Sequence, residues 1–393
     1  VLKYLEEKFE GRTSKISTLT CLKTKILLKE CGKIIDEIED SEMTKVSAMI
    51  PEVYGQLKDL NEAYEEVDDL KEWCNENPDV YNIALKLRGL IKNKGVHASA
   101  VSISYDNLDD SCPTELTSKE DGFVSSFDMN WISQFNVKLD ILGLKAVSII
   151  DRTCKLIGIE PKDIDINDLE IYRNLQDLKA PKGLFQIEAE TNYKVCREVR
   201  PQNLEQLSAV LAIARPGALN FKDQYARYVE TGTQADIHPF FDDILSSTGG
   251  VCLYQEQMMQ MAHKVGFTLD EAEILRRIVG KKKVEEVAEW KQKITDKIKE
   301  NKLEPEIGDI LWTVLEDSAN YSFNKSHSIA YAALAACTIW LKFKYPKEFF
   351  VSLLEMSRHE QDSIKEVSMI HKEFHHFDLE LHPPHIIKSK MDF

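Results

Sequence analysis

The 393-residue sequence lacks features that define several common classes of protein. No run of apolar residues reaches the length of a membrane span, and the N-terminal VLKY does not begin a signal peptide. The eight cysteines form no Cys-x-x-Cys pair, which disfavours a zinc ribbon or a disulfide framework and favours reduced thiols in the cytoplasm. A Gly-x-x-x-x-Gly-Lys-Ser/Thr loop is also missing, which disfavours a Walker-type NTPase.

The composition is typical of a soluble globular protein, with 43% hydrophobic and 30% charged residues. The net charge of −16 argues against a protein that simply coats nucleic acid, because such binding needs clustered Lys and Arg. The charge is unevenly distributed, with an acidic excess from Asp36 to Asp79 and a dense basic run from Arg276 to Lys299. An acidic protein can still bind nucleic acid through a single surface that is lined with Lys and Arg. The length predicts two or three domains.

The segment from Asn320 to Pro346 has a polar and basic start followed by about fifteen mostly apolar residues. We predict a buried core helix that Asn324 or Ser326 caps. Lys325 and His327 add donors beside the free N–H groups of its first turn, an arrangement that suits an anion and most naturally a phosphate. An ordinary capped helix whose Lys325 and His327 face solvent is the alternative.

Periodicity predicts an α+β fold that is predominantly helical. In the first 92 residues we expect only helices, at Val1–Phe9, Leu19–Ile38, Tyr54–Tyr64 and Tyr81–Ile91. Alternating apolar residues then predict strands at Val96–Ile103, Gly122–Phe127 and Phe135–Ile141. The rest is expected to be almost wholly helical, with helices that include Gly143–Gly158, Leu184–Arg200, Leu204–Ala214 and Val251–Val265.

The third predicted strand carries Lys138 and Asp140 on one face. A carboxylate is a hard ligand for Mg²⁺ and an ammonium neutralises phosphate charge, so the pair suits a two-metal phosphoryl-transfer site. An exposed ion pair on a sheet face is the alternative, and taken alone this segment favours it.

Basic residues also gather at two turns. Arg276 and Arg277 lie near a helix end that continues into Lys281, Lys282 and Lys283. Basic capping of the helix does not account for all five cations, which suit a polyphosphate or a nucleic-acid backbone. In the second turn, which contains Pro and Gly, Arg215 is expected to point outward.

Five stretches in order carry a family resemblance: FNVKLDILGL (135–144), GLFQIE (183–188), AIARPG (212–217), YQEQ to LRRIVGKKK (254–283) and FNKSHSIAY (323–331). Together they resemble the C-family bacterial replicative DNA polymerases, the alpha subunit of DNA polymerase III. The resemblance covers nearly the whole chain.

The resemblance implies a DNA-directed DNA polymerase, bacterial or from a phage, that uses Mg²⁺, primer–template DNA and deoxynucleoside triphosphates. It implies a helical thumb at 1–91, the second part of a palm with a small antiparallel sheet at 92–144, large helical fingers at 145–375 and a connection leaving the fingers at 376–393.

Residue roles follow from the same motifs. Asp140 matches a catalytic, metal-binding aspartate of the palm, and Lys138 matches its phosphate-binding neighbour. The residues that match the surface for the incoming nucleotide are Arg276, Arg277, Lys325, Ser326 and His327. Contacts with DNA are expected from Lys94, His97, Arg215, Lys281, Lys282 and Lys283.

The sequence departs from the family in one respect, because the family's other two catalytic aspartates lie upstream of a segment like Val1–Phe9. We therefore expect the chain to be inactive without an upstream polymerase segment that carries them, and any sliding clamp to bind through other regions. A split gene and a truncated form both remain open. The alternative function is a non-catalytic module of the same fold that binds nucleic acid or serves replisome assembly.

Overall fold

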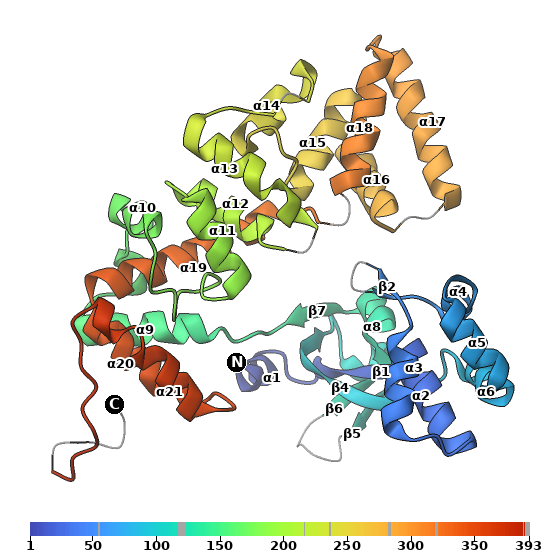
Figure 1. Ribbon diagram of the computed structural model, residues 1–393, viewed down its shortest axis with the longest axis horizontal. Helices are drawn as coiled ribbons and strands as arrows, with labels where there is room; N and C mark the ends of the chain where they lie inside the picture. Colours follow the sequence, from blue (N-terminus) through green and yellow to red (C-terminus); the bar gives the residue numbers. More distant parts are fainter. Residues whose placement is uncertain are drawn as a thin grey trace. The chain divides into compact units, whose positions relative to one another are not determined.

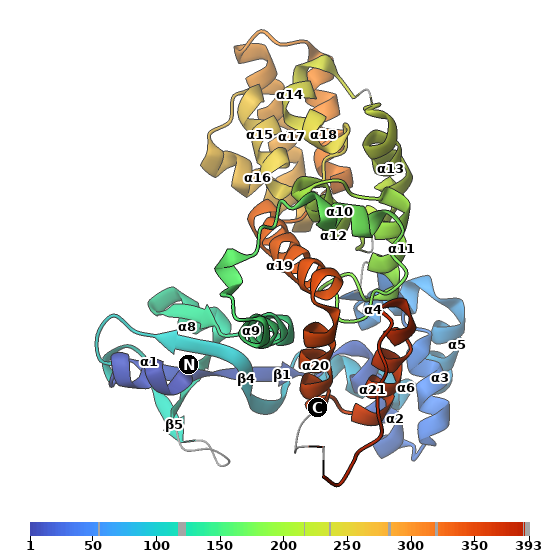
Figure 2. The same ribbon diagram turned by 90° about the vertical axis from the view of Figure 1, so that its left-hand side faces the viewer.

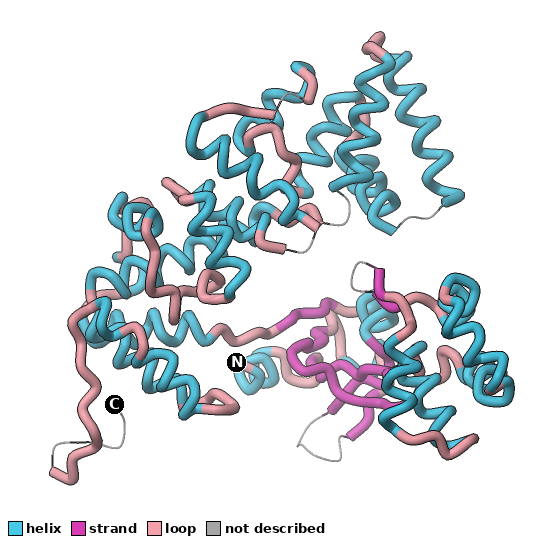
Figure 3. Tube along the Cα trace, in the orientation of Figure 1, coloured by secondary structure: helices cyan, strands magenta, loops and turns pink. Residues whose placement is uncertain are grey.

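The computed structural model describes residues 1–53, 56–116, 123–215, 217–235, 237–281, 284–318, 321–387 and 389 (Figure 1). The chain divides into two units, Val1–Gly143 and Leu144–Phe393. All strands of the described residues lie in the first unit, and the second is helical (Figure 3). None of the helices in the described part of the chain combines the length and the apolarity that crossing a membrane requires.

The first unit joins a sheet to a group of helices. Its strands are β1 (Thr13–Cys21), β2 (Glu52–Val53), β3 (Gln56–Leu57), β4 (Ile91–Ile103), β5 (Thr114–Leu116), β6 (Phe123–Asp128) and β7 (Val137–Asp140). Its helices are α1 (Leu2–Lys8), α2 (Thr24–Ile35), α3 (Asp40–Ala48), α4 (Leu60–Glu66), α5 (Asp68–Glu76), α6 (Pro78–Leu87), α7 (Leu108–Ser111) and α8 (Met129–Phe135).

The main sheet has five strands in the order β5-β6-β1-β4-β7. It is mixed and not purely antiparallel, because β1 runs parallel to β6 while its other neighbour, β4, is antiparallel to it. The buried side chains of Ile16, Ala100 and Ile132 form a small core between the sheet and α7 and α8. Helices α2 to α6 enclose a separate core. The three strands predicted beyond Lys92 are confirmed as β4, β6 and β7.

The prediction of an all-helical first 92 residues is wrong at the short strands β2 and β3, of which β3 lies within the helix predicted at Tyr54–Tyr64. It is also wrong at Thr13–Cys21, which forms the central strand β1. This segment is rich in Thr and Ser, and its pairing partner β4 begins only at Ile91, so no local pattern reveals the partner. The helix predicted from Leu19 therefore starts at Thr24. Because β1 belongs to the same sheet as β4, the sheet is not confined to residues 92–144.

The second unit consists of helices joined by short turns. Its α-helices are α9 (Lys145–Ile157), α10 (Leu169–Gln176), α11 (Glu190–Val199), α12 (Leu204–Ile213), α13 (Lys222–Thr231), α14 (Asp242–Leu245), α15 (Gln255–Val265), α16 (Leu269–Lys281), α17 (Val284–Glu300), α18 (Pro305–Ser318), α19 (Lys325–Lys344), α20 (Pro346–Ser357) and α21 (Ser363–His371). Short 3₁₀ turns are η1 (Pro161–Asp163), η2 (Ala218–Phe221), η3 (Pro239–Phe241), η4 (Ser246–Thr248) and η5 (Phe374–His376).

Helix α19 is the central helix of this unit and packs against α9, α10, α12 and α20 (Figure 2). Small buried residues, Ala332, Ala335 and Ala336, join it to the core around α10 to α13. Its C-terminal half contributes Leu341 to a second core with α9, α20 and α21. The predicted buried core helix is therefore confirmed. Helices α14 to α18 enclose a third core.

Two predicted helices start later than expected. Residues 184–188 form turns, because Gln186 takes a positive φ of 59° that an α-helix does not accommodate, and α11 begins at Glu190. The segment before Gln255 is extended because the side chain of Gln257 accepts hydrogen bonds from the N–H groups of Leu253 and Tyr254. The predominantly helical α+β class is confirmed.

Candidate functional site

The first turn of α19 is capped as the sequence predicted. The side-chain oxygen of Asn324 accepts a hydrogen bond from the backbone N–H of His327 at 2.8 Å. Ser326 and His327 are exposed, while Ser328 is buried and donates to the carbonyl oxygen of Ser208 on α12 at 2.8 Å. The turn is therefore anchored on its inner side and open on its outer side.

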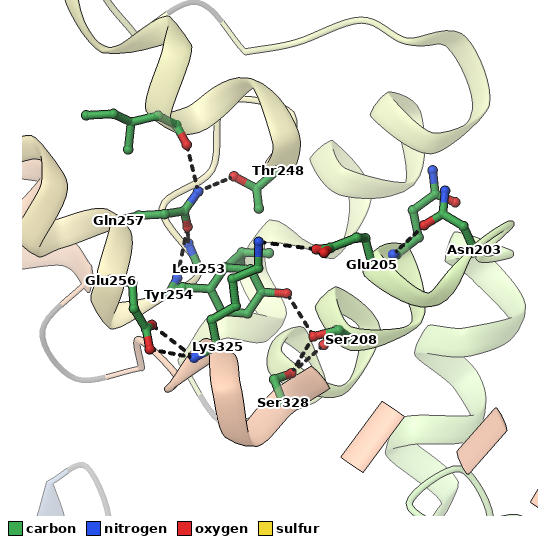
Figure 4. Close-up of polar contacts among 12 residues, drawn as sticks. Asn203, Glu205, Ser208, Thr248, Leu253, Tyr254, Glu256, Gln257, Lys325 and Ser328 are labelled. Carbon is green, nitrogen blue, oxygen red and sulfur yellow. Dashed lines mark hydrogen bonds and ion pairs between the residues drawn. The ribbon is translucent and has the colours of Figure 1, made fainter. Parts of the chain in front are cut away.

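An internal carboxylate lies where the sequence predicted an anion. Both oxygens of Glu256, on α15, accept from the backbone N–H of Lys325, at 2.9 and 3.1 Å (Figure 4). One of them also accepts from the side-chain amide of Asn324 at 2.8 Å. The positive end of the α19 dipole thus already meets a negative charge from another helix.

Lys325, Arg276 and Arg277 are each paired with a glutamate. Nζ of Lys325 lies 3.3 Å from a carboxylate oxygen of Glu205 (Figure 4). Glu273 accepts from Nε and a terminal nitrogen of Arg276, both at 2.7 Å, and from Nε of Arg277 at 2.7 Å. Hydrogen bonds from Arg276 are the main reason that the pKa of Glu273 falls to about 2.

The two arginines differ in exposure, since 20% of the Arg276 side chain and 65% of the Arg277 side chain is accessible. Hydrogen bonding to Glu273 raises the pKa of Arg276, and the charge of Glu256 adds to the effect. Arg276 is therefore within electrostatic reach of the carboxylate that holds the first turn of α19. The structure brings Arg276 and Lys325 to one region although they lie on different helices.

A small cavity of about 150 Å³ lies beside the same turn. Arg215 and His327 both line it, together with Gln186, Phe323 and Tyr331. The guanidinium of Arg215 lies 3.8 Å from the centre of the Phe323 ring, and the rings of His327 and Tyr331 have centroids 4.0 Å apart. Partial burial of its guanidinium lowers the pKa of Arg215. Arg215 is exposed as predicted, but its guanidinium stacks on an aromatic ring.

In the first unit, Lys138 and Asp140 lie on one face of β7, as predicted. Nζ of Lys138 is 3.2 Å from a carboxylate oxygen of Asp140, of whose side chain 47% is exposed. In the sheet register, Ser102 on β4 lies opposite Lys138 and Ser14 on β1 lies opposite Ser102. Both serine hydroxyls are buried without a hydrogen-bond partner, so a polar strip runs across three strands beside the Lys138–Asp140 pair.

His97 and Lys94 lie on β4 and line a cavity of about 820 Å³. Nδ1 of His97 accepts from the N–H groups of Ser99 and Ala100, at 3.2 and 2.9 Å, and so stabilises a bulge where β4 changes register with β1. Ala100 is the residue opposite Asp140. Lys94 forms an ion pair of 2.6 Å with Glu115. His97 therefore has a local structural contact that its sequence position did not reveal.

Lys282 and Lys283 lie outside the described residues, and so does the side chain of Lys281. Among the described residues, the one group of three potential metal ligands is His238, Glu304 and Glu306, and it does not include Asp140. Nδ1 of His238 accepts from the N–H of Phe240, which keeps the ring proton on Nε2 and opposes a metal there. Among the described residues, Asp140 therefore belongs to no group of three potential metal ligands.

Sequence reasoning missed three glutamates that contact the predicted nucleotide-binding residues, Glu205, Glu256 and Glu273. Glu273 had a signal, because it stands three and four residues before the two arginines on one helix. Glu205 and Glu256 had none, because each reaches Lys325 from a distant part of the chain.

Comparison with known proteins gives two family matches. Residues 1–143 match the family described as bacterial DNA polymerase III alpha NTPase domain. Residues 146–302 match the family described as bacterial DNA polymerase III alpha subunit finger domain. The boundary between the two matched ranges nearly coincides with the boundary between the two units along the chain.

Curated relatives are similar over the whole chain. DNA polymerase III subunit alpha of Deinococcus radiodurans is 32% identical over 100% of this chain and 31% of its own length. The subunits of Thermus aquaticus and Caulobacter vibrioides are 30% and 29% identical, again over 100% of this chain and over 33% and 35% of theirs. The chain thus spans about a third of the length of these relatives.

Proposed function

We propose that this chain is part of a replicative DNA-directed DNA polymerase of the bacterial C family, the family that its relatives and both family matches support. The observation that carries the proposal is the meeting of basic side chains from separate elements around the first turn of α19. Arg215, Arg276, Lys325 and His327 come from three distant sequence motifs. Such a gathering suits the triphosphate of an incoming deoxynucleotide.

In this proposal Arg276, Arg277, Lys325, Ser326 and His327 bind the triphosphate. The paired glutamates do not prevent this, because the cations are partly exposed and a triphosphate carries more negative charge than any one carboxylate. Lys94, His97 and Arg215 bind primer–template DNA, together with Lys281, Lys282 and Lys283. The second unit then corresponds to the fingers, and the sheet of the first unit, β1 included, to part of the palm.

Asp140 and Lys138 are proposed as residues of the reaction itself, the attack of a primer 3′-hydroxyl on the α-phosphate. When bound, Mg²⁺ would stabilise the attacking and leaving oxygens of such a transfer. Asp140 supplies one carboxylate for it, and Lys138 places a positive charge 3.2 Å away for phosphate oxygens.

The remaining carboxylates are proposed to come from a further segment that pairs with β7. This strand ends the five-stranded sheet, so its outer edge has no strand partner among the residues that the structure describes. Its Val137 and Leu139 side chains are exposed. An unpaired edge with exposed apolar residues suits an added strand, which would place new carboxylates beside Asp140. We propose that the chain is inactive without such a segment. We also propose that the polymerase acts in the cytoplasm.

Primer extension tests this function. The chain is mixed with a primer–template, Mg²⁺, all four deoxynucleotides and a separately expressed upstream palm segment that carries an Asp-x-Asp pair. Extension by the mixture that Asp140→Asn abolishes, while DNA binding stays the same, is the expected result. Asp151→Asn, which changes an exposed aspartate on α9, is the matched control and should extend normally.

The alternative is a non-catalytic module that binds nucleic acid or assists replisome assembly. It predicts salt-dependent DNA binding by the chain but no extension in any mixture. Equal extension by the wild-type chain and Asp140→Asn would also contradict the assignment of Asp140.

A further inference from the structure

Glu256 makes contacts that point to a role in the proposed nucleotide site beyond packing. It is the second residue of α15, and its carboxylate reaches across to the start of α19 (Figure 4). Both of its oxygens accept from the N–H of Lys325, and Oε1 also accepts from Nδ2 of Asn324. Hydrogen bonds to an ionised acceptor are stronger than neutral ones.

The contact with Asn324 fixes the direction of an amide that has one donating and one accepting end. Because Nδ2 donates to Glu256, Oδ1 is the atom left to accept from the N–H of His327, which it does at 2.8 Å. A reversed amide would set two donors, Nδ2 and the His327 N–H, against each other. Glu256 therefore determines the capping geometry of the turn that presents Lys325 and His327.

Glu256 is itself held firmly. The next residue, Gln257, is buried, and its Oε1 accepts from the N–H groups of Leu253 and Tyr254 at 2.9 and 3.0 Å. Its Nε2 donates to Oγ1 of Thr248 at 2.7 Å (Figure 4). The start of α15 is thus locked to the extended segment before it, and Glu256 projects from a rigid base.

The buried side of the α19 turn is fixed separately. The hydroxyl of Ser208 on α12 contacts both the Tyr254 hydroxyl, at 3.1 Å, and the Ser328 hydroxyl, at 2.9 Å. These contacts hold the inner side of the turn whatever the state of Glu256. Loss of the Glu256 carboxylate should consequently loosen the first turn without unfolding α19.

We propose that Glu256 is a positioning residue, which holds Asn324 and Lys325 so that Lys325 and His327 face the incoming triphosphate. This inference rests on the proposed function. Glu256 binds no substrate in this scheme, and its effect passes through the first turn of α19.

A swap of donor and acceptor tests the proposal. Glu256→Gln keeps the shape but replaces one of the two acceptor oxygens with an NH2 donor. This donor opposes either the N–H of Lys325 or Nδ2 of Asn324, so at least one contact of Glu256 is lost. Asn324→Asp sets two carboxylates against each other. The double variant Glu256→Gln/Asn324→Asp restores the hydrogen bond, because the amide now at position 256 donates to the carboxylate now at position 324, which still accepts from His327. The double variant has the same net charge as the wild-type chain.

Two measurements are made on the wild-type chain and the three variants. The first is the Kd for dATP with Mg²⁺ by equilibrium titration, and the second is amide hydrogen exchange in the peptide 321–331. Each single variant should bind dATP about tenfold more weakly and exchange faster in the first turn, as expected for one lost charge-assisted hydrogen bond. The double variant should recover most of both losses.

Each other outcome contradicts a specific statement. Equal dATP affinity in all four proteins would overturn the positioning role, and so would tighter binding by Glu256→Gln, since Glu256 would then compete with the phosphates. If the wild-type chain binds no dATP at millimolar concentration, the proposed function is overturned instead. Exchange alone then decides whether Glu256 holds the turn, and unchanged exchange in both single variants would refute it.

Discussion

Nζ of Lys342 on α19 lies 2.6 Å from a carboxylate oxygen of Glu373, and the lysine side chain is completely buried. The ammonium also donates to the carbonyl oxygens of Ala180 and Lys182, at 2.7 and 2.6 Å. The N–H of Lys182 donates to the other oxygen of Glu373 at 2.7 Å. The pair therefore ties the loop before Gly183 to the end of the central helix.

Removal of Glu373 should be costly for stability. Glu373→Ala leaves a buried ammonium without its anion, and we expect the free energy of unfolding to fall by about 3–5 kcal/mol. The double variant Lys342→Met/Glu373→Ala should regain part of this loss, because no buried charge remains. Urea denaturation measures the differences.

The control for this prediction is Glu360→Ala, which breaks an exposed ion pair of 2.7 Å with Lys145 and should cost less than about 1 kcal/mol. A loss in Glu373→Ala no larger than in this control would show that the buried pair contributes little.

The stability contributed by Lys342 should depend on pH. Burial lowers its pKa to about 8 from the usual 10.5, although Glu373 opposes the shift. Between these values the unfolded chain binds more protons than the folded chain, so stability rises with pH in that window. The difference in unfolding free energy between wild type and Lys342→Met should be flat below pH 8 and then grow by about 3 kcal/mol at most. A difference that shrinks in this window would mean that the ion pair outweighs burial.

Two glycines allow backbone strain to be separated from steric overlap. Gly232 and Gly250 both have positive φ, of 72° and 81°. A Cβ at Gly232 would meet nothing within 4 Å, whereas one at Gly250 would overlap the carbonyl oxygen of Ala235. Gly232→Ala should cost about 1–2 kcal/mol and Gly250→Ala about 3 kcal/mol or more, measured by urea denaturation. Similar losses in the two variants would refute the overlap.

Nucleotide affinity should depend on the arginine pair of α16. We expect Arg276→Ala/Arg277→Ala to weaken dATP binding by about 3 kcal/mol, because charge-assisted contacts with the phosphates are lost. Equilibrium titration with dATP and Mg²⁺ measures the effect.

The matched control is Lys155→Ala/Lys194→Ala, which removes two cations that are 66% and 64% exposed and also pair with an acid four residues earlier. Its affinity for dATP should equal that of the wild-type chain. An equal decrease in both double variants would indicate a nonspecific effect of net charge and contradict the assignment of Arg276 and Arg277.

Local patterns were sufficient for several parts of the fold. The alternation around Lys138 and Asp140 predicted β7 and put both side chains on one face, as the ion pair confirms. Asn324 before an apolar run predicted the cap and the core position of α19. Such features depend on residues within one or two turns or on neighbouring strand positions, so the sequence displays them directly.

Other parts were not accessible to this reasoning. The local pattern does not reveal the strand β1, because its partner β4 starts only at Ile91. The apolar pattern of residues 320–346 also gives no sign that Lys342 is buried and paired with Glu373 from the C-terminal part of the chain. The first turn of α19 was predicted to receive an external anion, and the position of Glu256 against it was not foreseen.

The sequence by itself determined the helical class, the strands beyond Lys92, the capped central helix and the resemblance to a polymerase family. The tertiary structure alone decided which charges meet: Glu256 with the α19 turn, Glu205 with Lys325, and Glu373 with Lys342. The physical reason is the range of the interactions. Periodicity and capping act between near neighbours along the chain, whereas an ion pair depends on distance in space, which only the packed helices fix.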